Sequence, residues 1–346
     1  MVKVAMLYTG HSNANAVRPL EVGSYLEARG HEVVPVDLLD LAYTKLVRLK
    51  EPFVSHGLRY GLLGGKAVVS QMRKWADVIQ REVLDVDRFD AIICMSFLHA
   101  HILTRDLPCI KIYDCPTPAV DELEYSGEYS DEVIEALRAE EMDIYRSSDH
   151  VLFHWDTYRE YVRKYRYDGP NLVTMRYGCH AKESRARFAK PPRAAYLGYL
   201  GGYWAGLELL SQLSRQEVCD IDVYGFPRPD KDLGLNYRGF AEGTEVLTEY
   251  QLGLITCSRD RLRREGFSAK HLEYISYGLP VLVPEWRTGL DLIKGSVPYN
   301  EENFGQVVTG LSDEDTWTGL SDQAYEQAKD LSWDNTLKGL EGICGG

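Results

Sequence analysis

The sequence predicts an α/β protein made of two successive βαβ domains, and two observations carry this prediction. The chain of 346 residues is too long for one comfortable hydrophobic core. In both halves, short apolar runs that resemble buried strands alternate with helix-like stretches, which is typical of parallel sheets covered on both faces. The composition, 45% apolar and 26% charged, is that of an ordinary globular protein.

In the first half, the apolar run 2–8 predicts a buried strand. A helix is expected from Pro19 to Arg29, because proline suits the first helical position and Gly30 suits the position after the last. Further strands are predicted over residues 32–36, 90–95, 109–113 and 151–154.

The alternation breaks near residues 175–192 and then restarts, so we place a hinge near residue 185. The N-terminal domain is expected at 1–180 and the C-terminal domain at 190–346. In the second domain, strands are predicted over 194–197 and 221–225, a helix over 207–213, and a helix-to-strand passage over 250–257. A closing helix is expected over about 322–339, and it could pack on either domain.

Charge and cysteine usage exclude several classes of protein. The net charge of −13 argues against a nucleic-acid partner, which needs a basic surface. Seven cysteines without a CxxC pair, together with an N-terminus that lacks a signal-peptide pattern, predict a cytoplasmic protein with reduced thiols. No GxGxxG motif follows the first strand, so a dinucleotide site lacks its fingerprint.

One segment, from Lys45 to Lys74, is strongly basic and also rich in apolar residues. Such a mixture could contact an anionic membrane surface or a lipid-diphosphate acceptor. Solvated helices covering the sheet are the alternative, and the pattern favours them slightly.

The most informative segment spans residues 264–283. Ser268 is a good N-cap, and Gly278 with Pro280 ends the helix before a strand at 281–283. Lys270 lies in the first turn, where the helix dipole disfavours a cation, so a negative ligand such as a diphosphate is expected there. The alternative is a capped surface helix with no ligand.

Two acidic residues flank this lysine. Glu273 lies one turn beyond Lys270 on the same helix face, placed to accept hydrogen bonds from hydroxyl groups next to the phosphate. Glu265, in the loop before the helix, can reach into the same site from the other side.

This segment resembles a motif of the group 1, family 4 glycosyltransferases of GT-B fold. Glu265, seven residues and Glu273 resemble their E-x7-E element, and 268–281 (SAKHLEYISYGLPV) resembles the stretch that contains it. The lysine three residues before the second acid resembles glucuronosyltransferases of the xanthan type. The resemblance implies that Ser268, Ala269 and Lys270 hold the donor diphosphate, Glu273 the nucleotide ribose, and Glu265 the region of the transferred sugar.

Shorter matches extend the resemblance over most of the chain. They are GHEV at 30–33, YLGYL at 196–200, GLELL at 206–210, NYRGF at 236–240 and SWD at 332–334. Phe240 is thereby implied beside the nucleobase. The chain departs from many relatives in having Tyr199 and Ala205 where they have an arginine and a lysine for the diphosphate. Arg259, Arg261 or Lys270 would then supply the charge.

An inverting transfer needs a general base from the N-terminal domain, and a retaining transfer does not. Asp114, after the predicted strand 109–113, is the leading candidate, and Asp121 is the next. Asp114 could instead cap its turn. Gly10, after the first strand, could let the backbone approach the donor, or could be an ordinary turn glycine.

No metal or other cofactor is expected. His99 and His101 are two residues apart and do not share a helix face, and the Asp-x-Asp matches at 85–87 and 220–222 arise easily by chance.

The sequence therefore predicts a GT-B fold with two Rossmann-like domains facing across a cleft. The expected activity is glycosyl transfer from a nucleotide-diphosphate sugar, with UDP or GDP favoured, to a hydroxyl of a glycan, a lipid-linked sugar or a small molecule. The alternatives are a nucleotide-sugar epimerase of the same fold and a non-catalytic sugar-binding homologue.

Overall fold

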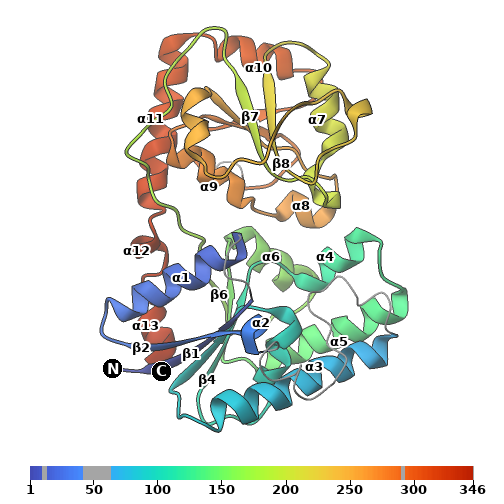
Figure 1. Cartoon of the computed structure of the whole chain (residues 1–346), viewed down its shortest axis with the longest axis vertical. Helices are drawn as coiled ribbons and strands as arrows, with labels where there is room; N and C mark the ends of the chain where they lie inside the picture. Colours follow the sequence, from blue (N-terminus) through green and yellow to red (C-terminus); the bar gives the residue numbers. More distant parts are fainter. Residues whose placement is uncertain (10–13, 42–63, 290–292, 346) are drawn as a thin grey trace. The chain divides into compact units, whose positions relative to one another are not determined.

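The computed structural model of the chain describes residues 1–9, 14–41, 64–289 and 293–345. These residues form two compact units, each built on a six-stranded parallel sheet (Figure 1). Unit 1 comprises residues 1–177 and 336–346, and unit 2 comprises residues 178–335. The predicted α/β fold with two parallel sheets is confirmed.

The sheet of unit 1 has the strand order β2-β1-β3-β4-β5-β6. All residues of β3, and the apolar residues of β1 and β5, are buried, as expected for parallel strands covered on both faces. The strands are β1 (Lys3–Tyr8), β2 (Glu32–Asp37), β3 (Ala91–Cys94), β4 (Ile110–Cys115), β5 (His150–Phe153) and β6 (Leu172–Thr174). The helices are α1 (Ala14–Glu27), α2 (Leu38–Leu41), α3 (Gly65–Ile79), η3 (Gln80–Leu84), η4 (Phe97–Thr104), α4 (Ala119–Ser126), α5 (Asp131–Ser147) and α6 (Asp156–Tyr165).

The first helix differs from its predicted limits. It begins at Ala14, so Pro19 lies inside it rather than at its start, at the cost of one main-chain hydrogen bond. It ends at Glu27, and Gly30 adopts a left-handed conformation (φ 81°) that closes the turn before β2.

The sheet of unit 2 has the order β12-β11-β10-β7-β8-β9. The strands are β7 (Ala194–Tyr199), β8 (Ile221–Phe226), β9 (Asn236–Gly239), β10 (Leu252–Leu254), β11 (Val281–Pro284) and β12 (Ser296–Tyr299). The helices are η5 (Tyr203–Ala205), α7 (Leu207–Ser214), η6 (Lys231–Leu233), η7 (Glu245–Glu249), α8 (Arg261–Glu265), α9 (Ala269–Ser276), α10 (Phe304–Gly310) and α11 (Glu314–Asp330), followed by α12 (Trp333–Thr336) at the unit boundary.

The strand order of unit 2 creates a topological switch between β7 and β10. The chain runs from β7 outward to β8 in one direction and from β10 outward to β11 in the other. Right-handed crossovers therefore place α7 and α9 on opposite faces of the sheet, as Figure 1 shows. The loops that follow β7 and β10 diverge at this point, where open α/β sheets bind ligands.

The predicted closing helix over 322–339 is wrong in its limits. Helix α11 begins at Glu314, because the Asp313 side chain caps it by accepting a hydrogen bond from the Thr316 N–H (2.9 Å). It ends at Asp330, and two short helices follow, the second being α13 (Leu340–Gly345).

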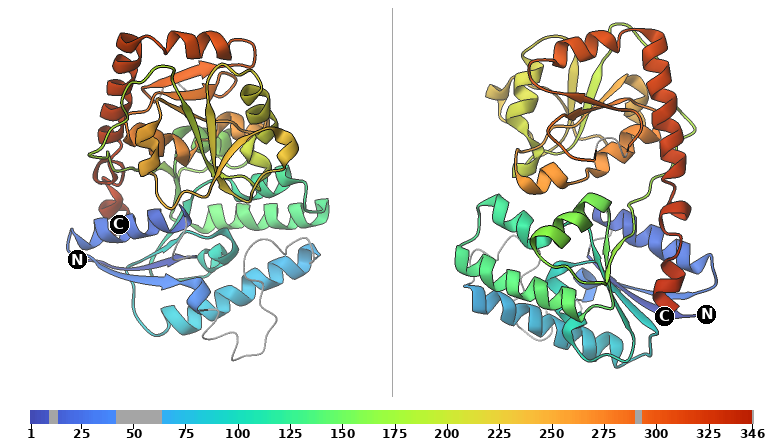
Figure 2. Two further views of the ribbon diagram at one scale, coloured as in Figure 1. Left: turned by 45° about the horizontal axis from the view of Figure 1, so that its top comes forward. Right: turned by 180° about the vertical axis from the view of Figure 1, so that it is seen from behind.

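The last residues of the chain belong to unit 1. In both views of Figure 2 the C-terminus lies close to the N-terminal strand. Leu340 and Cys344 of α13 are buried, and Glu341 pairs with Arg29 (3.0 Å). Unit 1 is therefore completed by a segment more than 150 residues away in sequence.

Within the described ranges, no helix is both long enough and apolar enough to cross a membrane.

Candidate functional site

The strongest candidate site in unit 2 lies at the carboxyl ends of β7, β10 and β11. It is built around the start of α9, which follows the loop after β10. Ser268 is the residue before the helix, as predicted, but its side chain makes no capping hydrogen bond. The first N–H groups of α9 are thus left for another acceptor, and they carry the positive end of the helix dipole.

Lys270 points from the first turn of α9 toward β7. Its Nζ donates a hydrogen bond to the Tyr196 hydroxyl (2.8 Å) and lies 4.2 Å from the centre of that ring. Gly198 leaves the room for it, because a Cβ there would lie 2.9 Å from Lys270 Cδ. No carboxylate pairs with this ammonium group among the described residues, so Lys270 holds a net positive charge at the topological switch.

Glu265 and Glu273, the two acidic residues of the predicted E-x7-E element, have different surroundings. Glu273 is exposed, and its carboxyl pKa is raised, mainly because its neighbours partly desolvate it, while Lys182 opposes the shift. Glu265, at the end of α8, is half-buried, and its Oε2 accepts a hydrogen bond from the Thr288 hydroxyl (2.5 Å). Glu273 remains accessible to a ligand hydroxyl, whereas Glu265 is held by the turn that follows β11.

A second cation stands beside the helix start. Arg287, in the turn after β11, is buried, and its Nη2 donates a hydrogen bond to the carbonyl oxygen of Gly266. Burial raises the pKa of the nearby Cys257 thiol, and the positive charges of Arg287, Arg263 and Lys270 oppose that rise. The positive charges of three side chains are therefore felt at Cys257, in the segment after β10.

Sequence reasoning did not identify Arg287, because a single arginine in a turn has no local signal. Gly198, however, does have a local signal in the sequence, because it directly follows the predicted strand over 194–197. A glycine inside a strand often marks the close approach of another group, and here that group is Lys270.

Three further predicted donor residues, Arg259, Ala269 and Phe240, lie in the described part of unit 2. Arg259 is exposed and pairs with Glu301 (3.2 Å). It lines a cavity of about 580 Å³ that also contacts Gly206, Glu208 and Cys257. Ala269 is exposed at the helix start, and the Phe240 side chain, just after β9, is 74% exposed.

Asp114 in unit 1 does not have the environment expected of a free general base. It lies inside β4 rather than after it, and it is buried. Arg18 Nε donates to one carboxylate oxygen (2.7 Å) and His154 Nε2 donates to the other (2.8 Å). Burial opposes ionisation, but the charge of Arg18 and these hydrogen bonds outweigh it and lower the Asp114 pKa.

His154 follows β5 and is the group in this cluster that could still accept a proton. Burial, assisted by the charge of Arg18, lowers its pKa to about 4, so the imidazole is neutral at physiological pH. Its Nε2 carries the proton donated to Asp114, which leaves Nδ1 as an acceptor.

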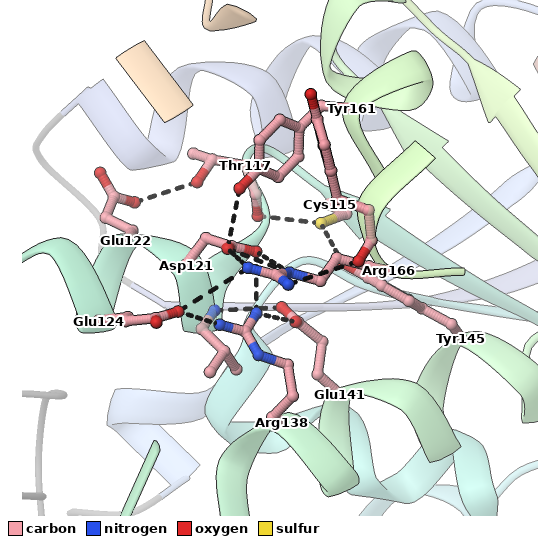
Figure 3. Close-up of polar contacts among 12 residues, drawn as sticks. Cys115, Thr117, Asp121, Glu122, Glu124, Arg138, Glu141, Tyr145, Tyr161 and Arg166 are labelled. Carbon is pink, nitrogen blue, oxygen red and sulfur yellow. Dashed lines mark hydrogen bonds and ion pairs between the residues drawn. The ribbon is translucent and has the colours of Figure 1, made fainter. Parts of the chain in front are cut away.

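Asp121, the second candidate base, is fully buried in a network of ion pairs (Figure 3). It accepts hydrogen bonds from Arg138 Nη1 (2.8 Å), from Arg166 Nε (3.1 Å) and from the Tyr161 hydroxyl (2.9 Å). These donors occupy its lone pairs, so Asp121 ties α4 to α5 and α6 and has no capacity left for an acceptor hydroxyl.

Two predicted features lie wholly or partly outside the described residues. Gly10 is one, and the part of the basic segment that contains Lys45 is the other. Lys66, Arg73 and Lys74 are described, and all three lie on the exposed face of α3.

Among the described residues, no three His, Cys, Asp or Glu side chains are placed to hold a metal ion.

Comparisons with known proteins reveal likeness in structure only. No protein-family model matches the sequence, and no curated protein matches it. Sucrose-phosphate synthase from Thermosynechococcus elongatus superimposes with a TM-score of 0.72 at 12% identity, covering 99% of this chain and 98% of that one.

Two structures with named ligands are also similar. Anabaena HepE in complex with UDP-glucose has a TM-score of 0.66 at 12% identity, covering 99% of this chain and all of that one. A S. aureus TarM mutant in complex with fondaparinux, α-GlcNAc-glycerol and UDP has a TM-score of 0.61 at 10% identity, covering 80% of this chain and 59% of that one. The two parallel sheets with flanking helices, together with these matches, define the chain as a protein of GT-B fold.

Proposed function

We propose that the protein is a glycosyltransferase that takes a sugar from a nucleoside-diphosphate sugar bound by unit 2. One observation carries the proposal. At the switch point of the sheet, the open first turn of α9 and the ammonium group of Lys270, which pairs with no carboxylate of the described residues, together suit a doubly charged anion.

This arrangement suits the chemistry of glycosyl transfer. An acceptor oxygen forms a bond to the anomeric carbon, the bond from that carbon to the diphosphate breaks, and the proton of the acceptor hydroxyl passes to the leaving diphosphate or to water. The leaving diphosphate gains negative charge in the transition state, and a fixed ammonium group and helix N–H groups stabilise that charge.

The acidic residues are proposed to orient the donor. Glu273 would accept hydrogen bonds from the ribose hydroxyls, consistent with its exposed side chain. Glu265 would face the transferred sugar, with Thr288 holding its carboxylate in place. In this proposal the two residues form an E-x7-E element.

The structural neighbours support a nucleotide-sugar donor. The HepE structure is described with UDP-glucose and the TarM structure with UDP. We therefore propose UDP as the first nucleotide to test and GDP as the second, with no metal required.

The TarM structure also holds saccharide ligands, which favours a glycan over a small molecule as acceptor. Other similar structures are named as a glycosyltransferase from Rickettsia africae and as spinosyn forosaminyltransferase, so transfer is favoured over epimerisation.

We further propose a cytoplasmic protein that meets the inner membrane surface through the basic segment from Lys45 to Lys74. Co-sedimentation with anionic vesicles at low salt tests the contact, and a protein that stays in the supernatant contradicts it.

The test of the donor site is nucleotide binding. Thermal-shift measurements with UDP, GDP, ADP and TDP should show stabilisation by at least one of them, because a ligand that binds only the folded state raises the melting temperature. Glu273→Ala should weaken that binding, whereas Glu249→Ala, on an exposed part of η7, should not. If no nucleotide shifts the melting temperature of the wild-type protein, the donor site is wrong.

A further inference from the structure

Arg287 is a buried cation whose charge the described residues do not neutralise. Arg287 is only 9% exposed, and its Nε has no hydrogen-bond partner among the described residues. Its Nη2 donates to the Gly266 carbonyl oxygen. Among the described residues, no carboxylate forms an ion pair with the guanidinium.

Such an arrangement is unfavourable unless an anion completes it. Burial of an unpaired charge is strongly unfavourable, and arginine cannot relieve that cost by losing its proton. Burial and the charge of Arg287 together lower the His271 pKa to about 3, so that imidazole stays neutral.

A purely structural role does not explain why this residue is charged. The turn that contains Arg287 is already tied to α8 by its neighbour Thr288, whose N–H donates to the Arg264 carbonyl oxygen (2.9 Å). The Thr288 hydroxyl also donates to Glu265 (2.5 Å). A neutral side chain would suffice to hold the loop.

The position of Arg287 fits an anion at the start of α9. Gly266, which it contacts, lies two residues before the N-cap Ser268. Lys270 approaches from the first turn, and both cations act on Cys257, which follows β10. A planar guanidinium, an ammonium group and open helix N–H groups are the donors that proteins use for phosphate groups.

We infer that Arg287 binds the diphosphate of the donor together with Lys270, and so replaces the charge missing at Tyr199 and Ala205. The inference rests on the proposed function and assigns a residue of the turn after β11 to the donor site. Tyr199 is half exposed and stacks on Trp204, and Ala205 is buried, so neither brings charge to this site.

Titration calorimetry with inorganic pyrophosphate tests the inference directly, because this probe has no base, ribose or sugar. Wild type should bind it, and Arg287→Gln and Lys270→Gln should each weaken the affinity by about tenfold or more. Gly198→Ala should weaken it as well, because the new Cβ displaces Lys270. The matched control is Arg215→Gln, which alters an exposed arginine at the end of α7.

A second titration with the nucleoside diphosphate that stabilises the wild type, and with its nucleoside, separates charge from loop structure. If Arg287 binds the diphosphate, Arg287→Gln lowers affinity for the diphosphate and spares the nucleoside. If Arg287 only shapes the loop, both affinities fall together. Arg287→Lys keeps the charge without the planar fork, so it should recover part of the affinity, and it serves as the test variant if Arg287→Gln does not fold.

The outcomes are distinguishable. A folded Arg287→Gln protein that binds pyrophosphate as tightly as wild type overturns the inference and leaves the donor site intact. Wild-type protein that binds a nucleoside diphosphate but not pyrophosphate also overturns it. Wild-type protein that binds neither removes the proposed function itself.

Discussion

At the scale of single residues, the surroundings of Asp114 show which groups its carboxylate already binds. Asp114 was predicted as the general base from its place after a strand. In the structure both of its oxygens are engaged, one by Arg18 and the other by His154. A carboxylate stabilised in this way is a weak proton acceptor, so its main effect is on the stability of unit 1.

Asp114→Asn should therefore destabilise unit 1, because it leaves Arg18 buried without its partner. The melting temperature should fall by about 10 °C near neutral pH. Since folding lowers the Asp114 pKa, its stabilisation is present above the unfolded-state pKa of about 3.9 and is lost as the pH falls below that value. The difference between variant and wild type should accordingly shrink in acid.

Differential scanning calorimetry between about pH 2.5 and pH 8 measures this difference, with the exposed Asp85→Asn as control. Nucleotide affinity should not change, because Asp114 lies in unit 1. If the variant melts like the wild type but loses glycosyl transfer, the prediction is wrong and Asp114 takes part in the reaction, as a general base would.

At the scale of elements, helix α4 is held by a buried carboxylate from another helix. Glu141, on α5, accepts a hydrogen bond from the N–H of Val120 in the first turn of α4 (3.1 Å). Arg138 lies one turn before Glu141 and also pairs with Asp121 (2.8 Å). Burial raises the Glu141 pKa to about 7, although Arg138 opposes the shift.

The raised pKa predicts a pH-dependent contribution from Glu141. A group whose pKa rises on folding stabilises the protein below its unfolded-state pKa of about 4.3, and that stabilisation is lost as the pH rises through 7. Glu141→Gln is neutral at every pH and keeps an oxygen for the Val120 N–H. Its melting temperature relative to wild type should therefore rise by about 5 °C between pH 5 and pH 8.

Thermal melts of both proteins across this pH range provide the measurement, and Glu135→Gln, exposed on the same helix, is the control. A relative melting temperature that does not change with pH would mean that Glu141 is ionised throughout and fully paired with Arg138.

At the scale of the whole molecule, the path of the chain links the stability of unit 1 to its last residues. After α11 the chain leaves unit 2, and α13 packs beside the N-terminal strand (Figure 2). Leu340 is fully buried there, so the core of unit 1 depends on a segment that follows all of unit 2.

Leu340→Ala should accordingly loosen unit 1 and spare unit 2. A buried leucine truncated to alanine costs about 3 kcal/mol. Hydrogen exchange followed by mass spectrometry should show faster exchange in β1 and β2, with β7 and β10 unchanged. Leu311→Ala, which truncates a buried leucine of unit 2, is the matched control and should give the reverse pattern. Equal acceleration in both units would mean that they unfold as one.

The sequence by itself determined the local features. Periodicity located most strands within one or two residues, because a run of buried apolar residues needs no distant partner to be recognised. Ser268 before α9 and the glycine that ends the turn after α1 were also visible locally. The helix limits are less well predicted. Pro19 lies inside α1 rather than at its start, and the Asp313 side chain begins α11 earlier than the sequence pattern indicates.

Only the tertiary structure decided which charges are available. Asp114 and Asp121 look like accessible acids in the sequence, yet arginines distant in sequence bury and occupy them. Arg287 looks ordinary, yet folding places it beside the start of α9 without a described carboxylate partner. The physical reason is that the availability of a charged group depends on burial and on partners from other elements, and the chain brings these together only when it folds.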